Sequence, residues 1–379
     1  HAGDNELDIP MFLRPTSETA MYTMFPLWIR AHKDLPLKVY QMVNTFRYET
    51  KQTRSFIRVR EIHFFEAHTA HADEECATRQ IKQDLEIVDN LMYELCLPII
   101  KARRPVWDTF PGAWYTIGID AIMPNGRTLQ VASCHHYRDQ WAKAFDLAYE
   151  NLEAEQQHCH QTTYGMSERL LGAIVGMHGD DNGLIMPPAI APFQVVIVPI
   201  YRNDEQLEKI KEIVLEIKSS LEQRNITVKF DDRDTHKPGW KFAEYELKGV
   251  PVRLAIGMRD VENGTIEVAR RDTLEKETLK VENIDVQVED LLNKIQKNLF
   301  DKANNFREEN TFNADSYEEF KELIERGGFV YAHWDGTSET EEIIKNETKA
   351  TIRCIPETSD VNEGKCVFSA KKSKQRVLF

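Results

Sequence analysis

The sequence predicts a protein of mixed architecture: an α+β domain built on an antiparallel β-sheet, then an α/β domain, then a small α+β module. Three observations lead to this prediction. The chain has 379 residues, which exceeds the roughly 100–150 residues of an ordinary domain. A hairpin pattern occupies its first half, and a strand–helix–strand pattern begins near residue 192. We therefore expect domains at 1–191, 192–300 and 301–379.

The first domain combines one long helix with strands. Apolar residues recur at helical spacing over 73–95, and Pro98 stops that helix. Two strand-like runs, 114–117 and 128–131, flank the turn Met123-Pro124-Asn125-Gly126. This pattern predicts a hairpin of an antiparallel sheet.

The second domain begins after the double proline Pro187-Pro188. A buried strand at 195–198, a helix with apolar residues from 207 to 221 and a strand at 228–230 follow in order. This β-α-β pattern predicts an α/β domain whose last helix ends near Phe300.

The third segment contains a short helix. Asp315-Ser316 is typical of an N-cap, and Gly327-Gly328 is typical of a helix stop. We therefore expect a helix over 316–326 in a small C-terminal module.

Composition excludes several classes of protein. Hydrophobic residues make up 41% and charged residues 29%, and no apolar run approaches the roughly 20 residues that span a bilayer, so we expect a soluble protein and no membrane partner. The net charge of −14 argues against an unspecific polyanion binder. The six cysteines lie far apart in a long chain, which indicates reduced thiols in a cytoplasmic setting, and they contain no Cys-x-x-Cys pair. His1–Asn5 carry neither an initiator Met nor a signal-peptide pattern, so we expect a chain that is cut at its front.

The segment richest in chemistry is a strand over 43–49, a charged loop over 50–55 and a strand over 57–62. On a strand, Arg47 and Glu49 point to the same face. A guanidinium can bind a phosphate oxygen in a bidentate manner, and a carboxylate can accept from the exocyclic amine of adenine. The alternative is a cross-strand salt bridge on an exposed sheet.

These residues carry a resemblance to a known family. Phe46-Arg47-Tyr48-Glu49, with Arg58 and Arg60-Glu61, resembles motif 2 of the class II aminoacyl-tRNA synthetases. Tyr164-Gly165-Met166-Ser167-Glu168-Arg169, running into an apolar helix, resembles motif 3 and puts Arg169 in the place of the nucleotide-binding arginine. The resemblance implies the class II fold, an antiparallel catalytic sheet flanked by helices.

Two further segments are similar to those that mark the prolyl-tRNA synthetase family within class II: Leu13-Arg14-Pro15-Thr16-Ser17-Glu18 and Glu66-Ala67-His68-Thr69-Ala70-His71. The resemblance implies that Thr16 and Glu18 hold a secondary amine, whose two N–H donors suit a hydroxyl and a carboxylate. It assigns the walls of a slot for the proline ring to Ile62, Phe64 and His68, although the family commonly has Phe and Trp where Ile62 and Phe64 stand. Apolar alternation alone also fits core strand residues.

The resemblance assigns the remaining site residues in two groups. Arg47 and Arg169 stabilise the reacting phosphates, with ATP and Mg²⁺ as the expected nucleotide and ion. The proline contacts are Thr16, Glu18, Arg47, Ile62, Phe64, Glu66, His68, Tyr164 and Gly165. The ATP contacts are Arg47, Glu49, Arg58, Gln130, Ser133, His135, Ser167 and Arg169.

The α/β domain resembles the anticodon-binding domain of the prolyl, threonyl, glycyl and histidyl enzymes, which has a mixed sheet. The resemblance places Phe242, Glu246, Arg253 and Asp260 where the prolyl family reads the anticodon of tRNA(Pro), by stacking and by contacts to base edges.

The C-terminal module departs from similar proteins that bind zinc through four cysteines. Asp335 and Thr340 stand near the first pair, and Cys366-Val367-Phe368-Ser369 keeps one thiol of the second. Because a structural zinc needs four ligands, we expect no zinc and a module held by packing alone.

The resemblance implies a ligase that activates L-proline with ATP and loads it onto tRNA(Pro). It places motif 1, which builds the dimer interface, before residue 1, so a homodimer is expected through segments that this chain mostly lacks. One alternative is a threonyl or glycyl enzyme, against which Thr16-x-Glu18 and Glu66-x-His68 count. The other is a non-catalytic RNA-binding or regulatory paralogue, against which intact Arg47, Glu49 and Arg169 count.

Overall fold

The computed structural model describes residues 8–356 and 363–379, and the opening segment His1–Asn5 lies outside them. The chain divides into two compact units. The first comprises the described parts of 1–89, 99–173 and 309–379, and the second comprises 90–98 and 174–308. Whether the predicted boundaries at 191 and 300 separate domains stays a prediction.

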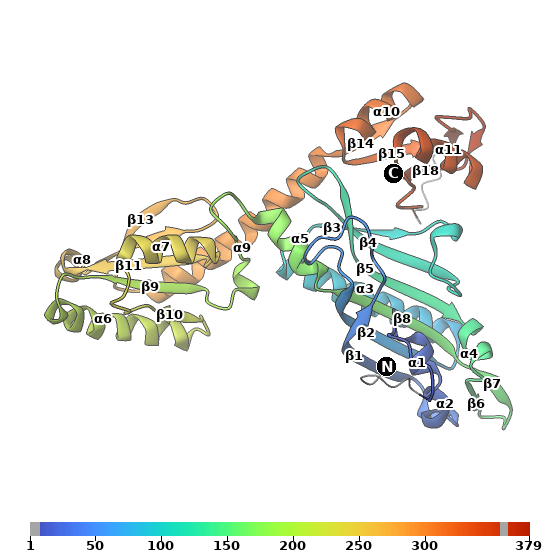
Figure 1. Ribbon diagram of the computed structural model, residues 1–379, viewed down its shortest axis with the longest axis horizontal. Coiled ribbons are helices and arrows are strands. Elements are labelled where there is room, and N and C mark those ends of the chain that lie inside the picture. The colour runs from blue at the N-terminus through green and yellow to red at the C-terminus, as the bar shows by residue number, and fades with distance from the viewer. Residues whose placement is uncertain (1–7, 357–362) are drawn as a thin grey trace. The chain divides into compact units, whose positions relative to one another are not determined.

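The first unit is built on a six-stranded sheet with the strand order β1-β2-β8-β5-β4-β3 (Figure 1). Every neighbouring pair in it is antiparallel, as predicted. The predicted hairpin is β4 and β5, and both strands are longer than the sequence indicated. The elements up to the start of the second unit are α1 Glu18–Tyr22, α2 Phe25–Trp28, η1 His32–Asp34, β1 Leu37–Phe46, β2 Glu61–His71, α3 Glu74–Glu94, β3 Ile99–Arg103, η2 Val106–Asp108, β4 Tyr115–Ile122, β5 Thr128–Arg138, α4 Gln140–Ala144, β6 Ala148–Glu150, β7 Gln156–His158, β8 His160–Ser167 and α5 Arg169–His178.

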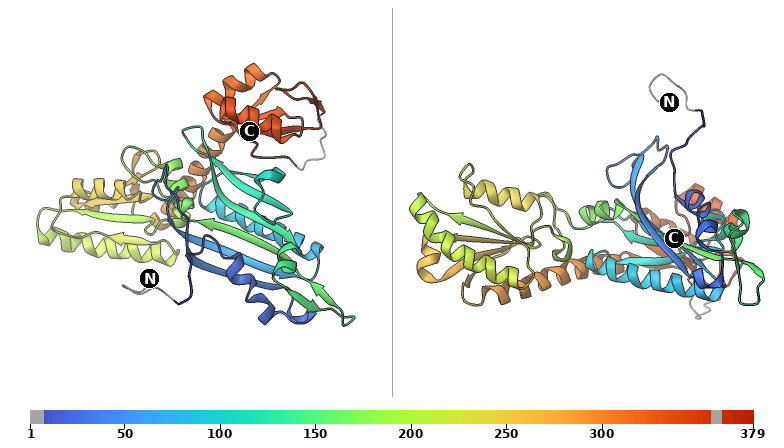
Figure 2. Two further views of the ribbon diagram at one scale, coloured as in Figure 1. Left: turned by 45° about the vertical axis from the view of Figure 1, so that its right-hand side comes forward. Right: turned by 90° about the horizontal axis from the view of Figure 1, so that it is seen from below.

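Helix α3 runs along one face of this sheet (Figure 2). Its start is capped, because the Asp73 carboxylate accepts from the Cys76 backbone N–H at 2.6 Å. The apolar stripe that predicted the helix, including Ile81, Val88 and Met92, is buried. The opposite face of the sheet is therefore left for other contacts.

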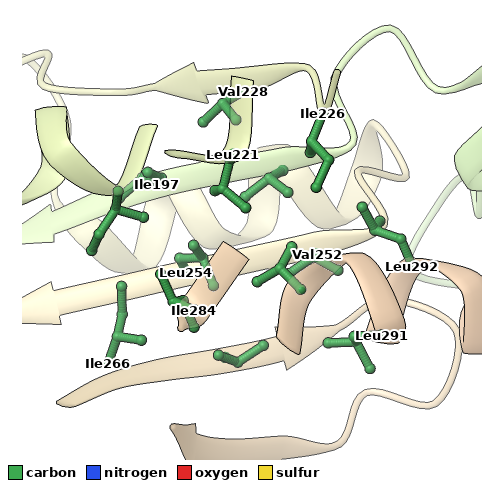
Figure 3. Close-up of a cluster of buried hydrophobic side chains, with 14 of the residues drawn as sticks. Ile197, Leu221, Ile226, Val228, Val252, Leu254, Ile266, Ile284, Leu291 and Leu292 are labelled. Atoms are coloured by element: carbon green, nitrogen blue, oxygen red, sulfur yellow. The ribbon is translucent and has the colours of Figure 1, made fainter. Parts of the chain in front are cut away.

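The second unit contains a five-stranded sheet with the order β10-β9-β11-β12-β13. Strands β9, β10 and β11 are parallel, and β12 and β13 are antiparallel, so the sheet is mixed. Figure 3 shows Leu221, Val252 and Leu291 gathered in its core, together with other branched aliphatic side chains. The elements are η3 Pro188–Ile190, β9 Val195–Ile200, α6 Asp204–Gln223, β10 Val228–Phe230, α7 Pro238–Leu247, β11 Val252–Gly257, α8 Met258–Asn263, β12 Thr265–Arg270, β13 Lys276–Lys280 and α9 Ile284–Glu309.

The prediction that the last helix of this unit ends near Phe300 was wrong. Helix α9 continues to Glu309. After Phe300 the apolar residues become sparse, but Asp301-Lys302-Ala303 and the following residues include good helix formers, and Ala303 is buried. Propensity therefore extends the helix beyond its main apolar stripe.

The C-terminal module belongs to the first unit and has a three-stranded sheet, β14-β15-β18. The predicted helix is present, with the Ser316 hydroxyl accepting from Glu319 N–H at 3.2 Å and Gly327 at φ 89° after its end. The elements are β14 Thr311–Ala314, α10 Tyr317–Arg326, β15 Phe329–His333, α11 Ser338–Thr348, β16 Gly364–Lys365, β17 Lys372–Ser373 and β18 Arg376–Leu378. Within the described residues, no helix has both the length and the apolar composition needed to cross a bilayer.

Candidate active site

A cavity of about 230 Å³ lies on the side of the six-stranded sheet that faces away from α3. Strands β2, β4, β5 and β8 supply side chains to its walls, and the segment entering α1 closes one end. The sequence-predicted residues that line it are Thr16, Glu18, Arg47, Phe64, Glu66, Gln130, Ser133, His135 and Gly165.

One end of the cavity is acidic. The Thr16 hydroxyl lies 2.5 Å from Glu18 Oε2 and 2.8 Å from Glu66 Oε1, so its single proton is shared between two carboxylates. Glu66 Oε1 also accepts from the Ser17 N–H at 3.1 Å, and Glu66 Oε2 accepts from Gln41 at 3.2 Å. Two buried carboxylates with so few positive partners form an environment that favours a small cation.

Glu18 is buried and held in place by Tyr137, whose hydroxyl donates to Glu18 Oε1 at 3.1 Å. Burial raises the pKa of Glu18 above its ordinary value. The hydrogen bond from Thr16 opposes this, and the charge of Glu66 adds to it. A bound cation would relieve the cost of keeping this carboxylate ionised.

The apolar wall is formed by Phe64, and Gly165 makes room for it. A Cβ atom on Gly165 would lie 3.0 Å from the edge of the Phe64 ring, which is closer than ordinary packing allows. Ile62 lies at the open end of β2, partly exposed, outside the residues that line the cavity.

His68 lies deeper on the same face, fully buried, and it contacts Tyr22 Oη and Thr163 Oγ1 at 3.3 Å each through Nδ1. Burial lowers the pKa of His68 to about 4, although the nearby Glu66 opposes the shift. His68 is therefore a neutral residue that lies beneath Glu66. Of the three residues predicted to form the slot for the proline ring, only Phe64 lines the cavity.

The side chain of Tyr164 does not join the predicted proline contacts. Strand β8 pairs Gly165 with Glu66 and Tyr164 with Ala67, so Tyr164 points to the α3 face. There its ring packs edge-on against Phe65, with centroids 5.5 Å apart. The motif was recognised correctly, but the alternation of side chains along β8 puts this one behind the sheet.

Two of the ATP-side residues predicted on β5, Ser133 and His135, belong to a chain of hydrogen bonds. His135 Nδ1 lies 2.9 Å from Thr116 Oγ1, and His135 Nε2 lies 3.1 Å from Ser133 Oγ. Burial lowers the pKa of His135 to about 3. His135 is a neutral imidazole whose ring is fixed by two hydroxyls.

The prediction that Arg47 and Glu49 lie on a strand was wrong. Strand β1 ends at Phe46 and β2 begins at Glu61, so residues 47–60 form a loop. Its two arms still pair through the backbone, from Arg47 N–H to Arg60 O at 2.9 Å and between Arg54 and Arg58. Glu49 lies 3.5 Å from Arg58, so the salt bridge weighed as an alternative exists, but it joins the two arms of this loop.

Arg169 stands at the first position of α5 and reaches back to this loop. Its Nε donates to Ile57 O at 2.9 Å, and its Nη1 donates to Gln130 O at 3.0 Å. Burial, followed by the charges of Arg47 and Arg58, lowers the pKa of Arg169. Three guanidinium groups therefore converge here, which favours a polyanion. Ser167 Oγ accepts from the Arg169 N–H at 3.3 Å and steadies the start of the helix.

Several cavity residues were missed by the sequence argument. They come from β4, from the segment between β3 and β4, and from β8 just before its motif, so none lies within a motif that was recognised. The tandem Arg103-Arg104 before Pro105 was the only signal in that stretch. The missed residues are Arg104, Asp108, Thr109, Phe110, Thr116 and Thr163.

In the second unit, three of the four predicted anticodon residues lie together. The Arg253 guanidinium stands over the Phe242 ring, 3.6 Å from its centroid, and Arg253 and Glu246 both line a cavity of about 210 Å³. Asp260 lies beyond the far end of β11, where its carboxylate accepts from Gly257 N–H at 2.8 Å and caps α8. The structure does not bring Asp260 together with the other three.

Comparison with known proteins agrees with this geometry. Residues 4–178 match the class II tRNA synthetase core domain of the G, H, P, S and T group, and residues 194–298 match the anticodon binding domain. An antiparallel sheet, a motif 2 loop whose Arg47 lines the cavity, and a motif 3 arginine that donates to the backbone of that loop together define a class II aminoacyl-tRNA synthetase.

The particular family follows from the third match and from the relatives. Residues 317–379 match the prolyl-tRNA synthetase C-terminal domain. The chain is 50% identical over 375 residues to the proline–tRNA ligase of Porphyromonas gingivalis, covering 99% of this chain and 76% of that one. It is 51% identical over 358 residues to the proline–tRNA ligase of Pyrococcus abyssi, covering 94% and 74%.

A solved structure, Giardia lamblia prolyl-tRNA synthetase in complex with prolyl-adenylate, superposes with a TM-score of 0.94 at 36% identity, covering 100% of this chain and 80% of that one. The chain belongs to the prolyl-tRNA synthetase family.

Proposed function

We propose that the chain activates L-proline with ATP and transfers the prolyl group to the 3′ end of tRNA(Pro), and that the cavity of the first unit performs both steps. One observation carries the proposal: two buried carboxylates with a shared hydroxyl line the same cavity as Arg47, and Arg58 and Arg169 lie close enough for their charges to act together with it. A cationic amine suits the carboxylates, and a polyphosphate suits the guanidinium groups.

Thr16 and Glu18 are proposed to hold the amine of proline. The protonated imino nitrogen has two N–H donors, and a hydroxyl oxygen with a carboxylate can accept both. Glu66 supports the proposal, because it can accept the hydrogen bond from the Thr16 hydroxyl, which leaves the lone pairs of the Thr16 oxygen free to accept from the amine. Phe64 supplies apolar surface for the ring, and Phe110 lines the same cavity.

The chemistry proposed needs no side-chain nucleophile. A carboxylate oxygen of proline attacks the α-phosphorus of ATP, the bond to the bridging oxygen breaks, and pyrophosphate leaves. Arg47 and Arg169 stabilise the charge that builds on the phosphate oxygens. A ribose hydroxyl at the 3′ end of the tRNA then attacks the prolyl carbonyl, and AMP leaves. Glu49 is proposed to accept from the adenine amine while Arg58 fixes its position.

Mg²⁺ is proposed to arrive bound to the phosphates of ATP. Among the described residues, no three His, Cys, Asp or Glu side chains are grouped so as to hold a metal ion. When bound, the ion would neutralise part of the charge on the phosphates.

Amino-acid-dependent exchange of pyrophosphate into ATP tests the proposal. We expect exchange with proline and little with threonine or glycine, because neither has a ring to fill the slot beside Phe64. Exchange with threonine but not proline would identify a different synthetase, and no exchange with any amino acid would favour a non-catalytic paralogue.

The second unit is proposed to read the anticodon through Phe242, Arg253 and Glu246. Replacing Phe242 with leucine keeps the apolar contact with the cluster that includes Val196 and Tyr245, but removes the aromatic face. We expect the KM for tRNA(Pro) in aminoacylation to rise about tenfold, since a stacked base contributes on this scale. Proline-dependent exchange, which needs no tRNA, is expected to stay unchanged. Equal losses in both assays would contradict the assignment.

We also propose that the chain forms a homodimer. Strand β1 is an edge of its sheet, and edge strands offer unpaired backbone groups to a partner. Tyr40 and Met42 on this strand are 72% and 79% exposed. Phe12 is 92% exposed and lies two residues before Arg14, whose carbonyl accepts from the Phe46 N–H at the end of β1. Large apolar side chains gathered at a sheet edge support an association surface there.

The C-terminal module is proposed to be stable without zinc. Of the four positions that correspond to zinc ligands, Thr340 and Ser369 donate to Asp335, and Cys366 contacts Ser369. Its Oδ2 accepts from Thr340 Oγ1 at 2.8 Å and from Ser369 Oγ at 2.6 Å, and its Oδ1 accepts from Thr337 Oγ1 at 2.8 Å. Cys366 Sγ accepts from the Ser369 N–H at 3.4 Å. This network joins the same two segments that a metal would join.

Replacing Asp335 with alanine is expected to lower the free energy of unfolding of the module by about 2–3 kcal/mol, because it leaves several donors without an acceptor. The matched control is Glu339→Ala, which removes an exposed carboxylate from the first turn of α11. Chelator treatment of the wild type is expected to change nothing. A melting temperature that falls with chelator but not with Asp335→Ala would contradict the proposal.

The same carboxylate gives a pH dependence. Burial alone would raise the pKa of Asp335, but the hydrogen bonds from Ser369, Thr340 and Thr337 outweigh it, and the net pKa is lowered. Its stabilising effect is therefore present above the ordinary pKa of an aspartate, about 4, and is lost as the pH falls.

A further inference from the structure

Arg104 is a buried arginine at the edge of the catalytic cavity for which the mechanism above has no use. Its side chain is 2% exposed, yet it lines the cavity. Nη2 donates to Asp120 Oδ1 at 2.8 Å and to Gln130 Oε1 at 3.3 Å. Nη1 donates to the backbone carbonyl of Arg353 at 2.8 Å. A guanidinium held at three points in a dry site has a single orientation.

The surrounding backbone is shaped for this arginine. A Cβ atom on Gly118 would lie 2.2–2.4 Å from the Arg104 guanidinium, so only glycine leaves space for it at this point of β4. The pairing of β4 with β5 shifts register between Ile119 and Asp120, which brings Gln130 directly opposite Asp120. The bulge therefore puts the two acceptors of Arg104 side by side.

Charge decides what Arg104 can do. Asp120 is buried and paired with it at 2.8 Å, and Asp108 lies 3.8 Å from its Nε, so Arg104 brings no net positive charge to the cavity and is a poor phosphate binder. The contact with Gln130 has a different consequence. Because Arg104 donates to the Gln130 oxygen, the amide NH₂ of Gln130 is directed away from it and remains available as a donor.

The third contact of Arg104 comes from the C-terminal module. Arg353 is 249 residues away in sequence, and its carbonyl is the acceptor. Beside it, the Ile355 N–H donates to Arg103 O at 3.0 Å. The segment 353–355 is thereby attached to the residues at the end of β3, the far edge of the catalytic sheet.

We propose that Arg104 is a positioning residue that acts on the nucleotide through Gln130. It orients the amide of Gln130, and its bond to the C-terminal module makes that orientation depend on the module. The proposal rests on the proposed role of Gln130 as an ATP contact. Gln130 is held from two sides, since Arg104 fixes its side chain and Arg169 donates to its backbone carbonyl. Loss of Arg104 affects ATP through Gln130 and leaves Arg169 in place.

The test is a double-mutant cycle between Arg104 and Gln130, read in proline-dependent pyrophosphate exchange. Lysine at position 104 keeps the charge beside Asp120, but a compact ammonium cannot reproduce the planar fork that reaches three acceptors. We expect Arg104→Lys to raise the KM for ATP about tenfold and to change kcat less than about threefold. In the Gln130→Ala background, Arg104→Lys is expected to have almost no further effect.

The matched control is Arg103→Lys, whose side chain stands over the Tyr115 ring and is not part of the cavity lining. If Arg104→Lys folds poorly, the pair Arg104→Gln with Asp120→Asn removes both buried charges together and is expected to show the same rise in the KM for ATP. The proposal would be overturned if Arg104→Lys raised the KM for ATP equally in the wild type and in the Gln130→Ala background, or if it left the KM unchanged in the wild type. Failure of the proposed function is distinguishable, because the wild type would then show no exchange with proline.

Discussion

Replacing Arg169 with alanine is expected to slow proline-dependent pyrophosphate exchange about 10³-fold, the largest effect of any single change considered. Arg169 has five N–H donors and uses two of them for the carbonyls of Ile57 and Gln130, so donors remain for a phosphate oxygen. Those two bonds hold the guanidinium before the substrate binds. The loss should therefore appear in kcat, because the interaction strengthens as charge develops on the α-phosphate.

The control for this prediction is Arg127→Ala, which removes an exposed arginine from the turn between β4 and β5. Arg169→Lys is expected to recover only a small part of the rate, since an ammonium cannot keep both carbonyl bonds and still reach the phosphate. Melting temperatures of all three proteins separate lost catalysis from lost folding. Exchange by Arg169→Ala within about threefold of the wild type would remove the mechanism proposed.

Replacing Glu18 with glutamine is expected to lower kcat/KM for proline about 10²-fold while leaving the KM for ATP nearly unchanged. The amide cannot supply the negative charge that the protonated amine requires, and a hydrogen bond between charged groups is the stronger kind. The matched control is Glu86→Gln, which makes the same change at an exposed carboxylate on α3. A change in the KM for ATP equal to that for proline would mean that Glu18 does not face the amino acid.

The Glu18→Gln substitution is also expected to have opposite effects on activity and on stability. Burial raises its pKa in the folded chain, so the ionised form is disfavoured there relative to the unfolded chain. Stability linked to Glu18 is therefore fully present below the ordinary pKa of about 4.3 and is lost as the pH rises through the folded pKa. Glu18→Gln is expected to melt at a higher temperature than the wild type at pH 7, and the difference should shrink as the pH is lowered.

The new side chain can also keep the hydrogen bonds of its site. The glutamine NH₂ can donate to Thr16, Thr16 can donate to Glu66, and Tyr137 can still donate to the glutamine oxygen. A variant that melts lower than the wild type at pH 7 would show that the Glu18 carboxylate stabilises the fold.

Much of the fold could be predicted because its signals are local. The period-two pattern around the turn at Met123–Gly126 predicted the β4–β5 hairpin, and the spacing of Ile81, Val88 and Met92 predicted α3. Ser316 was correctly placed as a helix cap. Cavity residues such as Thr16, Glu18 and Gln130 were found through short motifs whose members lie close together in the chain.

What could not be predicted depends on register and on long-range contacts. Arg47 and Glu49 alternate as strand residues do, but β1 has already ended at Phe46. The face taken by Tyr164 is set by the pairing of β8 with β2, and the position of Gln130 is set by a bulge. Arg104 was missed because its partner Arg353 lies 249 residues away. None of these relations is visible in a window of sequence.

We propose that the amine of proline binds at Thr16 and Glu18 and that the α-phosphate binds between Arg47 and Arg169. A crystal structure of this chain with a non-hydrolysable analogue of prolyl-adenylate is the decisive test. We expect the imino nitrogen within hydrogen-bond distance of Thr16 Oγ1 and Glu18, and phosphate oxygens bound by Arg47 and Arg169. A ligand whose ring nitrogen lies away from Glu18, or whose phosphate contacts neither arginine, would contradict it.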